Sequence, residues 1–198
     1  MSGRSILLVT QLAPPSGLIA ARRAAAFVKY LARLGHDVTV LTSLTSGQGD
    51  IEGATEVVRT RDALTTPLNW RRRHFEALSG SADSGYGRPS RVASLVVPDL
   101  ALATWLPFAL PRALALARRN DFDVVLTTSP PQSAHVVGLA LHRRGLPWIA
   151  ELRDGWTFEP PRAPWPLRAQ RRLDAALERK VVGAADARAG GQVLERAF

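Results

Sequence analysis

Residues 121–156 read DFDVVLTTSPPQSAHVVGLALHRRGLPWIAELRDGW, and they decide the fold of this chain. The run Asp123–Thr127 is rich in β-branched residues, the segment Gln132–Arg144 repeats apolar residues at helical spacing, and Pro147–Leu152 is a second apolar run. This order predicts a strand, a helix and a strand. The two strands should be parallel neighbours, because parallel strands are joined by a long crossover connection, which is almost always right-handed.

Two loops leave the carboxyl ends of these predicted strands, Thr128–Gln132 and Arg153–Thr157. In an open parallel sheet, ligands bind in the crevice outside the carboxyl ends of the strands, so we expect both loops to face one crevice. Asp154 can accept a hydroxyl proton or orient a substrate hydroxyl there, and Arg153 can hold a phosphate. The alternative is an internal salt bridge between the two residues that shapes the loop.

The N-terminal part of the chain repeats the pattern. The apolar run Ser5–Thr10 precedes the loop Gln11–Gly17, and the helical segment Leu18–Leu34 leads to the apolar run Asp37–Thr42. Gly17 lies between a strand and a helix start, where backbone N–H groups favour anions. These segments predict a second strand–helix–strand unit in the same parallel sheet.

The first loop and helix are purely cationic, because no acidic residue precedes Asp37. Arg22, Lys29 and Arg33 fall on a different helix face from the apolar stripe. This predicts either a solvated face or a surface for phosphates or anionic lipid. The net charge of +9 also admits nucleic acid as a partner, but no recognised nucleic-acid motif accompanies the charge, so we do not expect such binding.

The middle of the chain is less regular. Thr55–Thr60 predicts a short third strand, and residues 61–90 predict a variable basic insertion with three consecutive arginines flanked by aromatic residues. Those aromatic residues are suited to a membrane interface or to nucleic acid bases, or else they pack under an exposed turn. Asp99 predicts a helix start, and the helical pattern should break near Pro107 and Pro111.

The C-terminal part predicts three more elements. Leu167–Val182 has the pattern of a highly charged helix, Ala184–Ala189 that of a weak strand, and Gln192–Phe198 that of a beginning helix. No segment is long and apolar enough to predict a membrane span.

Several chemistries are not supported by the sequence. The absence of cysteine excludes disulfides and thiolate metal sites, and neither a dinucleotide-binding glycine fingerprint nor a phosphate-loop lysine occurs. His135 and His142 lie two helical turns apart, too far for one metal ion. Asp121 and Asp123 imitate a metal-binding pair but enter their strand at its amino end, away from the crevice. We therefore expect no metal and no cofactor.

Five segments spread along the chain share a further pattern. They are PPSG at Pro14–Gly17, LARLGHDVTVLT at Leu31–Thr42, PDLALATW at Pro98–Trp105, TTSPPQSAH at Thr127–His135 and LPWIAELRDGW at Leu146–Trp156. Together they resemble the N-terminal domain of the family 4 glycosyltransferases, which have the two-domain GT-B architecture. The chain departs from that family at Ser16, where glycine is frequent, and at Gly155, where proline is usual.

The resemblance implies a Rossmann-like α/β domain over residues 1–198, a parallel sheet with helices on both faces that forms one half of a GT-B architecture. It implies transfer of a sugar from a nucleotide-sugar donor, with retention and without a metal. In that family the N-terminal domain binds the acceptor and the C-terminal domain supplies most donor contacts. The sequence holds no such second half, so we expect the chain alone to be catalytically incomplete.

The same resemblance suggests roles for individual residues. Ser16 and Gly17 should face the donor phosphates, and Asp154, as the catalytic residue, should lie nearest the reacting hydroxyl. The acceptor side should be lined by Ser129, His135, Arg153 and Trp156. The acceptor is expected to be a glycan or a lipid-linked molecule, with the protein cytoplasmic and peripheral at the inner membrane face. The alternative is a non-catalytic binding or partner subunit that kept the fold.

Overall fold

The computed structural model describes residues 3–63, 96–153, 155–157, 165–190 and 194–196. The elements appear in an alternating order that the sequence pattern predicts for most of the chain. They are β1 (Ser5–Val9), α1 (Ile19–Arg33), β2 (Asp37–Ser43), the 3₁₀ helix η1 (Leu44–Ser46), β3 (Glu56–Thr60), α4 (Ala101–Thr104), α5 (Leu106–Arg119), β4 (Val124–Ser129), α6 (Ala134–His142), β5 (Trp148–Leu152), α7 (Arg168–Ala184), β6 (Ala187–Gly190) and β7 (Leu194–Arg196).

The strands form one sheet in the order β3-β2-β1-β4-β5-β6-β7. Strands β1 to β6 are parallel, and β7 runs antiparallel to β6. The order reverses between β1 and β4, which is the point at which doubly wound sheets bind their ligands. The predicted Rossmann-like α/β fold is therefore confirmed, and so is the parallel pairing of β4 with β5.

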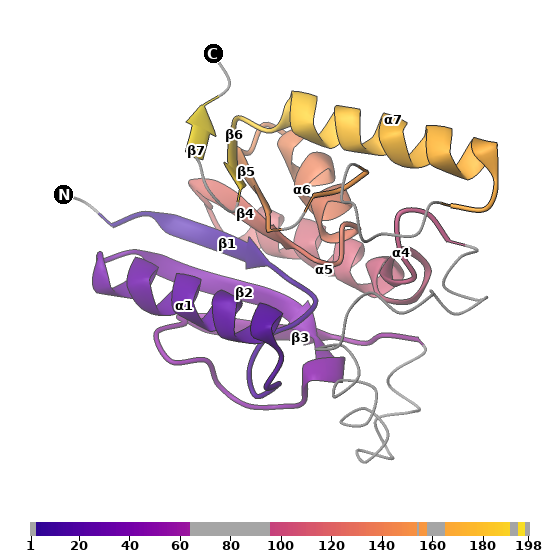
Figure 1. Ribbon diagram of the computed structural model, residues 1–198. Coiled ribbons are helices and arrows are strands. Elements are labelled where there is room, and N and C mark those ends of the chain that lie inside the picture. Colours follow the sequence, from indigo (N-terminus) through magenta and orange to yellow (C-terminus); the bar gives the residue numbers. More distant parts are fainter. Residues whose placement is uncertain (1–2, 64–95, 154, 158–164, 191–193, 197–198) are drawn as a thin grey trace.

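Helices cover both faces of the sheet, as Figure 1 shows. On one face α1 packs through Val28 onto apolar residues of β1, β2 and β4. On the other face the core includes Trp105 and residues of α5, α6 and α7, which pack onto the opposite side chains of the strands. The near-continuous apolar strands of the sequence are explained by this burial on two sides. Among the described residues, no helix has the length and apolar character needed to cross a membrane.

Two predictions about local structure were wrong. Residues 194–196 form β7 instead of the beginning of a helix, because a segment this short does not distinguish the helical period from the strand period. The helical break predicted near Pro107 is present, at Trp105, but the break predicted near Pro111 is not. Pro107 sits in the first turn of α5, where a missing N–H costs nothing, and Pro111 lies inside that helix without ending it. The predicted insertion at 61–90 falls outside the described residues from Leu64 onward.

Candidate active site

The candidate site lies at the carboxyl edge of the sheet, around the reversal of strand order. Val9 of β1 is paired with Thr127 of β4, and Ser129 at the end of β4 is paired with Leu152 at the end of β5. The loops that leave these three strands therefore begin at the same edge. The prediction that residues 128–132 and 153–157 leave side by side is confirmed by this register.

The loop that follows β1 is fixed at its base and open at its tip. The Ala13 N–H donates to Ser46 Oγ at 3.1 Å, and Arg59 Nη2 donates to the carbonyl of Pro14 at 2.6 Å. Burial lowers the pKa of Arg59, and Asp50 opposes that shift. Ser16 is half-buried and its Oγ accepts from the Leu18 N–H at 3.4 Å. Gly17 is exposed, and a Cβ built on it would meet nothing within 4 Å, so a ligand can approach the backbone here.

The N-terminus of α1 has no capping group of its own. Leu18 occupies the N-cap position, no side chain in the described part of the chain caps the first turn, and that turn contains no acidic residue. The first backbone N–H groups of a helix carry a partial positive charge and seek acceptors. Arg22 adds a positive charge near this end, whereas the charge of Arg23 is balanced by Glu151. The carboxyl edge thus presents N–H donors and cations together, as an anionic ligand requires.

The N-terminus of α6, which follows β4, differs from that of α1, because a side chain of the protein accepts hydrogen bonds from its first residues. Asp99 accepts the Ser133 N–H at 2.8 Å and the Ser133 hydroxyl at 2.8 Å. Burial raises the pKa of Asp99, while these hydrogen bonds oppose the shift. Asp99 was predicted to cap the helix that follows it, and its carboxylate does interact with the backbone of Ala101 and Leu102 at the start of α4. It also caps the start of α6, which is distant in the sequence. Of the two helix N-termini that follow β1 and β4, only that of α1 is left for an external anion.

A buried ion pair joins α1 to the end of β5. Glu151 is fully buried, its Oε1 lies 2.5 Å from Arg23 Nη2, and its Oε2 accepts the hydroxyl of Thr128. At this distance the two opposite charges form an ion pair. Arg23 is 38% exposed, so its guanidinium reaches from the interior to the surface of the edge. The pair fixes the N-terminal half of α1 over the ends of β4 and β5.

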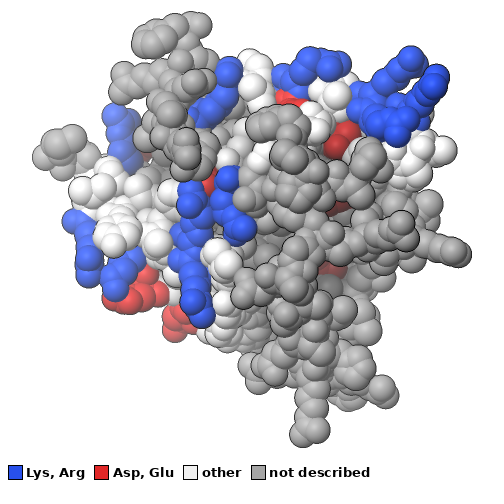
Figure 2. Space-filling model, viewed as in Figure 1, with Lys and Arg blue, Asp and Glu red and all other residues white. Residues whose placement is uncertain are grey.

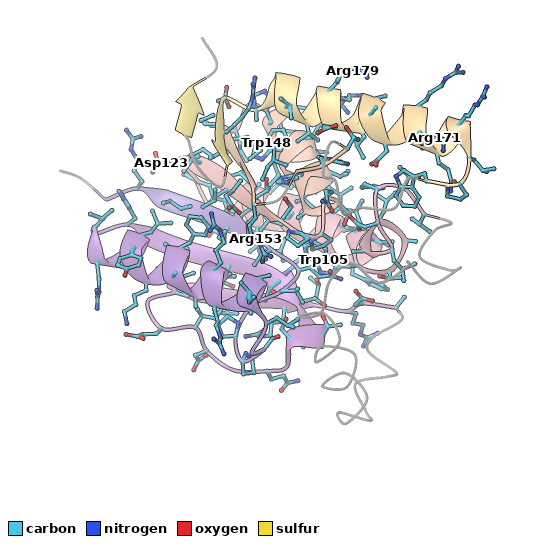
Figure 3. All side chains as sticks on the ribbon, viewed as in Figure 1. Trp105, Asp123, Trp148, Arg153, Arg171 and Arg179 are labelled. Carbon is cyan, nitrogen blue, oxygen red and sulfur yellow. The ribbon has the colours of Figure 1, made fainter. Side chains whose placement is uncertain are left out.

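Arg153 lies at the same edge. It follows β5 directly and is half-buried. In the view of Figure 3 Arg153 is labelled where the end of β5 and α1 overlap, and Glu151, two residues earlier on the strand, is paired with Arg23 of α1. Asp154, the predicted catalytic residue, lies outside the described residues. Ser16 and Gly17 thus precede the N-terminus of α1, and Arg153 follows β5 at the same edge of the sheet, each of them at least partly exposed.

Three other predicted site residues are enclosed and do not line a crevice in this structure. Ser129 is 3% exposed, and its Oγ donates to the carbonyl of Glu151 at 3.4 Å. His135 is fully buried, with its Nδ1 2.7 Å from Thr127 Oγ1, and burial lowers its pKa to about 3. Trp148 Nε1 also donates to Thr127 Oγ1 at 2.8 Å. His135 is therefore a neutral core residue in this structure.

Trp156 is the third enclosed residue, at 1% exposure. Its Nε1 donates to Asp174 Oδ1 at 2.8 Å, and Trp165 Nε1 donates to the other oxygen of the same carboxylate at 2.6 Å. Asp174 is itself buried in α7. The tryptophan thus fastens the segment after β5 to α7, and its role is structural.

Glu151, Thr128 and Arg23 were not predicted from the sequence as site residues. A signal was present for Glu151, because it is a charged residue inside the apolar strand WIAEL and occupies a position that alternates with the core residues Trp148 and Ala150. A buried charge needs a partner, so this pattern predicts a cation on the same sheet face. The identity of that cation as Arg23 depends on tertiary structure.

Comparison with known proteins agrees with this description. No curated protein matches the chain. Among solved structures, SsfS6, a glycosyltransferase of Streptomyces sp. SF2575, shares 19% identity with a TM-score of 0.49, over 91% of this chain and 44% of that protein. The chain thus spans less than half the length of that glycosyltransferase. The family described as glycosyl transferase 4-like domain matches residues 20–190, nearly the whole sequence. The chain belongs to this family of glycosyl transferase 4-like domains.

Proposed function

We propose that this chain is the acceptor-binding half of a glycosyltransferase that moves a sugar from a nucleotide-sugar donor to a hydroxyl of a glycan or lipid-linked acceptor. The observation that carries the proposal is the uncapped, cationic start of α1 at the shared carboxyl edge of β1, β4 and β5. Membership in the glycosyl transferase 4-like family supports the same reaction class.

The chemistry accounts for this arrangement. Transfer breaks the bond between the anomeric carbon and the donor phosphate, and negative charge develops on the leaving diphosphate. Backbone N–H groups and cations held in place beforehand stabilise such charge without a metal. In the proposed reaction, the first turn of α1, reached through Ser16 and Gly17, faces the phosphates. Arg153 either stabilises the negative charge of the leaving diphosphate or orients its neighbour Asp154.

The acceptor must lose a proton as its oxygen forms the new bond to the anomeric carbon. We assign to Asp154, the residue that follows Arg153 in the sequence, the orientation of that hydroxyl and the acceptance of its proton. The buried pair of Glu151 and Arg23 acts indirectly in this proposal, by keeping α1 in place over the ends of β4 and β5. Sugar transfer with retention is expected, as the family resemblance implies.

The test joins this chain to a donor-binding half taken from a related glycosyltransferase and measures release of the nucleoside diphosphate with a panel of acceptors. Asp154→Asn and Arg153→Gln should each lower turnover by about 100-fold or more, since one polar group in a preorganised site has this effect. Asp121→Asn is the control, because Asp121 is exposed and precedes β4 at the opposite edge of the sheet. Unchanged turnover in Asp154→Asn would remove that residue from the mechanism. Tight binding of a nucleotide-sugar without turnover would favour a non-catalytic subunit.

A further inference from the structure

The outward face of α1 carries basic and large apolar side chains along its whole length. Ile19 and Tyr30 of α1 are 58% and 61% exposed, and Leu34, the C-cap residue of the helix, is 71% exposed. Between them, Arg22, Lys29 and Arg33 are spaced seven and four residues apart, so they lie on one side of the helix. We call this surface the α1 stripe, and it consists of Ile19, Arg22, Lys29, Tyr30, Arg33 and Leu34.

The α1 stripe has a net positive charge. A shallow hollow on it is lined by Arg22, Lys29 and Arg33 and by one acidic residue, Glu52. Glu52 lies 3.6 Å from Lys29, but it is 82% exposed, and an exposed pair of this kind contributes little. Figure 2 shows basic side chains gathered over this face of the molecule, with acidic ones at its border. The guanidinium of Arg33 lies 5.8 Å from the ring centre of Tyr30, so the two types of side chain are in contact.

We propose that the α1 stripe binds the surface of an anionic lipid bilayer. Anionic headgroups neutralise the arginines and the lysine, while tyrosine and aliphatic side chains insert at the boundary between headgroups and acyl chains. The inner face of α1 is committed to the core through Ala21, Ala24 and Val28. The helix therefore stays on its domain, and the contact is shallow, reversible and sensitive to salt.

The direction of α1 gives this surface a consequence for the reaction, and this step rests on the proposed function. The N-terminus of α1 begins at the carboxyl edge, where Arg23 meets Glu151, and the helix runs away from that edge along the face of the sheet. A bilayer lying along the stripe would therefore reach the rim of the candidate site. An acceptor anchored by a lipid tail could enter that site without leaving the membrane.

The test measures sedimentation of the full chain with vesicles of phosphatidylcholine containing phosphatidylglycerol, and with vesicles of phosphatidylcholine alone. The charge variant is Arg22→Gln/Lys29→Gln/Arg33→Gln, and the apolar variant is Ile19→Ser/Leu34→Ser. The matched control is Arg168→Gln/Arg172→Gln/Arg179→Gln, because these three residues are also exposed on a helix and lie on α7, against the other face of the sheet. Circular dichroism spectra and melting temperatures verify that each variant is folded.

Binding should occur only with the anionic vesicles. The charge variant should bind on the order of 100-fold more weakly, because each basic residue near an anionic surface contributes about a tenfold effect or slightly less. The apolar variant should bind about tenfold more weakly, since two partly inserted side chains are removed. The control should stay within about threefold of the unchanged chain, as its charges are screened at a distance.

Four results would overturn the inference. These are equal binding to neutral vesicles, wild-type binding by the charge variant, an equal loss in the α7 control, and self-association of the chain that the apolar variant abolishes. A fifth result would also overturn it. If the chain bound single-stranded RNA and the apolar variant bound it equally well, the α1 stripe would be a surface for polyanions in general. Vesicle binding by the chain, together with no sugar transfer after it is joined to the donor-binding half, would leave this inference standing and remove the proposed function. Transfer to soluble acceptors without vesicle binding would do the reverse.

Discussion

The carboxylate of Glu151 and the guanidinium of Arg23 meet at 2.5 Å and join β5 to α1 directly behind the candidate site. The two partners differ in environment, because Glu151 is fully buried and the Arg23 side chain is 38% exposed. Thr128 donates its hydroxyl to the second carboxylate oxygen. The loss of either partner should therefore have unequal consequences.

We predict that Arg23→Met lowers the free energy of unfolding by about 3 kcal/mol, because it leaves an uncompensated buried carboxylate. Glu151→Gln should cost only about 1 kcal/mol, since the amide still accepts from Thr128 and the arginine can turn to solvent. The double variant should be more stable than Arg23→Met alone. Urea unfolding at neutral pH measures all three. If the two single variants lost the same free energy of unfolding, and the double variant lost the sum of the two, the two groups would not be coupled.

A second prediction concerns Gly138 of α6, which lies against the ring of Trp148. A Cβ at Gly138 would overlap the indole of Trp148 and crowd the methyl group of Thr127. All three residues are buried, so nothing can move aside cheaply. Gly138→Ala should lower the free energy of unfolding by about 3 kcal/mol, although alanine is the better helix former.

Gly183 offers the matched control for that substitution. It is also a helical glycine, in α7, but it is exposed and a Cβ would meet nothing within 4 Å. Gly183→Ala should raise the free energy of unfolding by up to about 1 kcal/mol. Urea midpoints of the two variants should therefore move in opposite directions. A stabilised Gly138→Ala would mean that Trp148 is not packed on α6 in solution.

The third prediction concerns the carboxylate of Asp99, which caps α6 from a distant segment. Asp99→Ala removes the acceptor of both Ser133 groups and should cost about 2 kcal/mol, at the upper end for a helix cap because the site is enclosed. Ser133→Ala should cost less, because the backbone N–H still has its acceptor. Chemical unfolding measures the costs, and hydrogen exchange should show the first turn of α6 opening in Asp99→Ala. Asp121→Ala, at an exposed position, is the control and should be neutral.

The fold and its edges were predictable because they depend on local patterns. Apolar runs gave the parallel strands, and the connection between β4 and β5 required them to open at one edge. Seven-residue segments such as 192–198 carry too few positions to decide between helix and strand. The alternation that distinguishes the two faces of a strand was readable in Trp148, Ala150 and Glu151.

The site was predicted less well, because proximity to a strand end does not determine where a side chain points. Ser129 ends β4 and His135 lies in the helix that follows it, as expected, yet both side chains are buried in the protein. The partners that turn them inward, Glu151 and Thr127, lie on strands whose register only the folded sheet provides. Gly17 and Arg153 were placed correctly at the edge because their positions follow from the chain path alone.

The last prediction concerns His135, whose burial lowers its pKa to about 3 from the ordinary value of 6.5. Between these two pH values His135 is protonated in the unfolded chain and neutral in the folded chain. The free energy of unfolding should therefore fall by about 1.4 kcal/mol for each pH unit below 6.5. His135→Asn retains an acceptor for Thr127 and removes this titration, so it should be less stable at neutral pH but should lose stability less steeply down to about pH 4. Val137→Ala, equally buried in α6, is the control for lost packing and should keep the steep pH dependence of the unchanged chain.

Urea unfolding at half-unit pH steps measures how steeply the free energy of unfolding of each variant changes with pH. Parallel slopes for the unchanged chain and His135→Asn would show that the imidazole is not held neutral in the core.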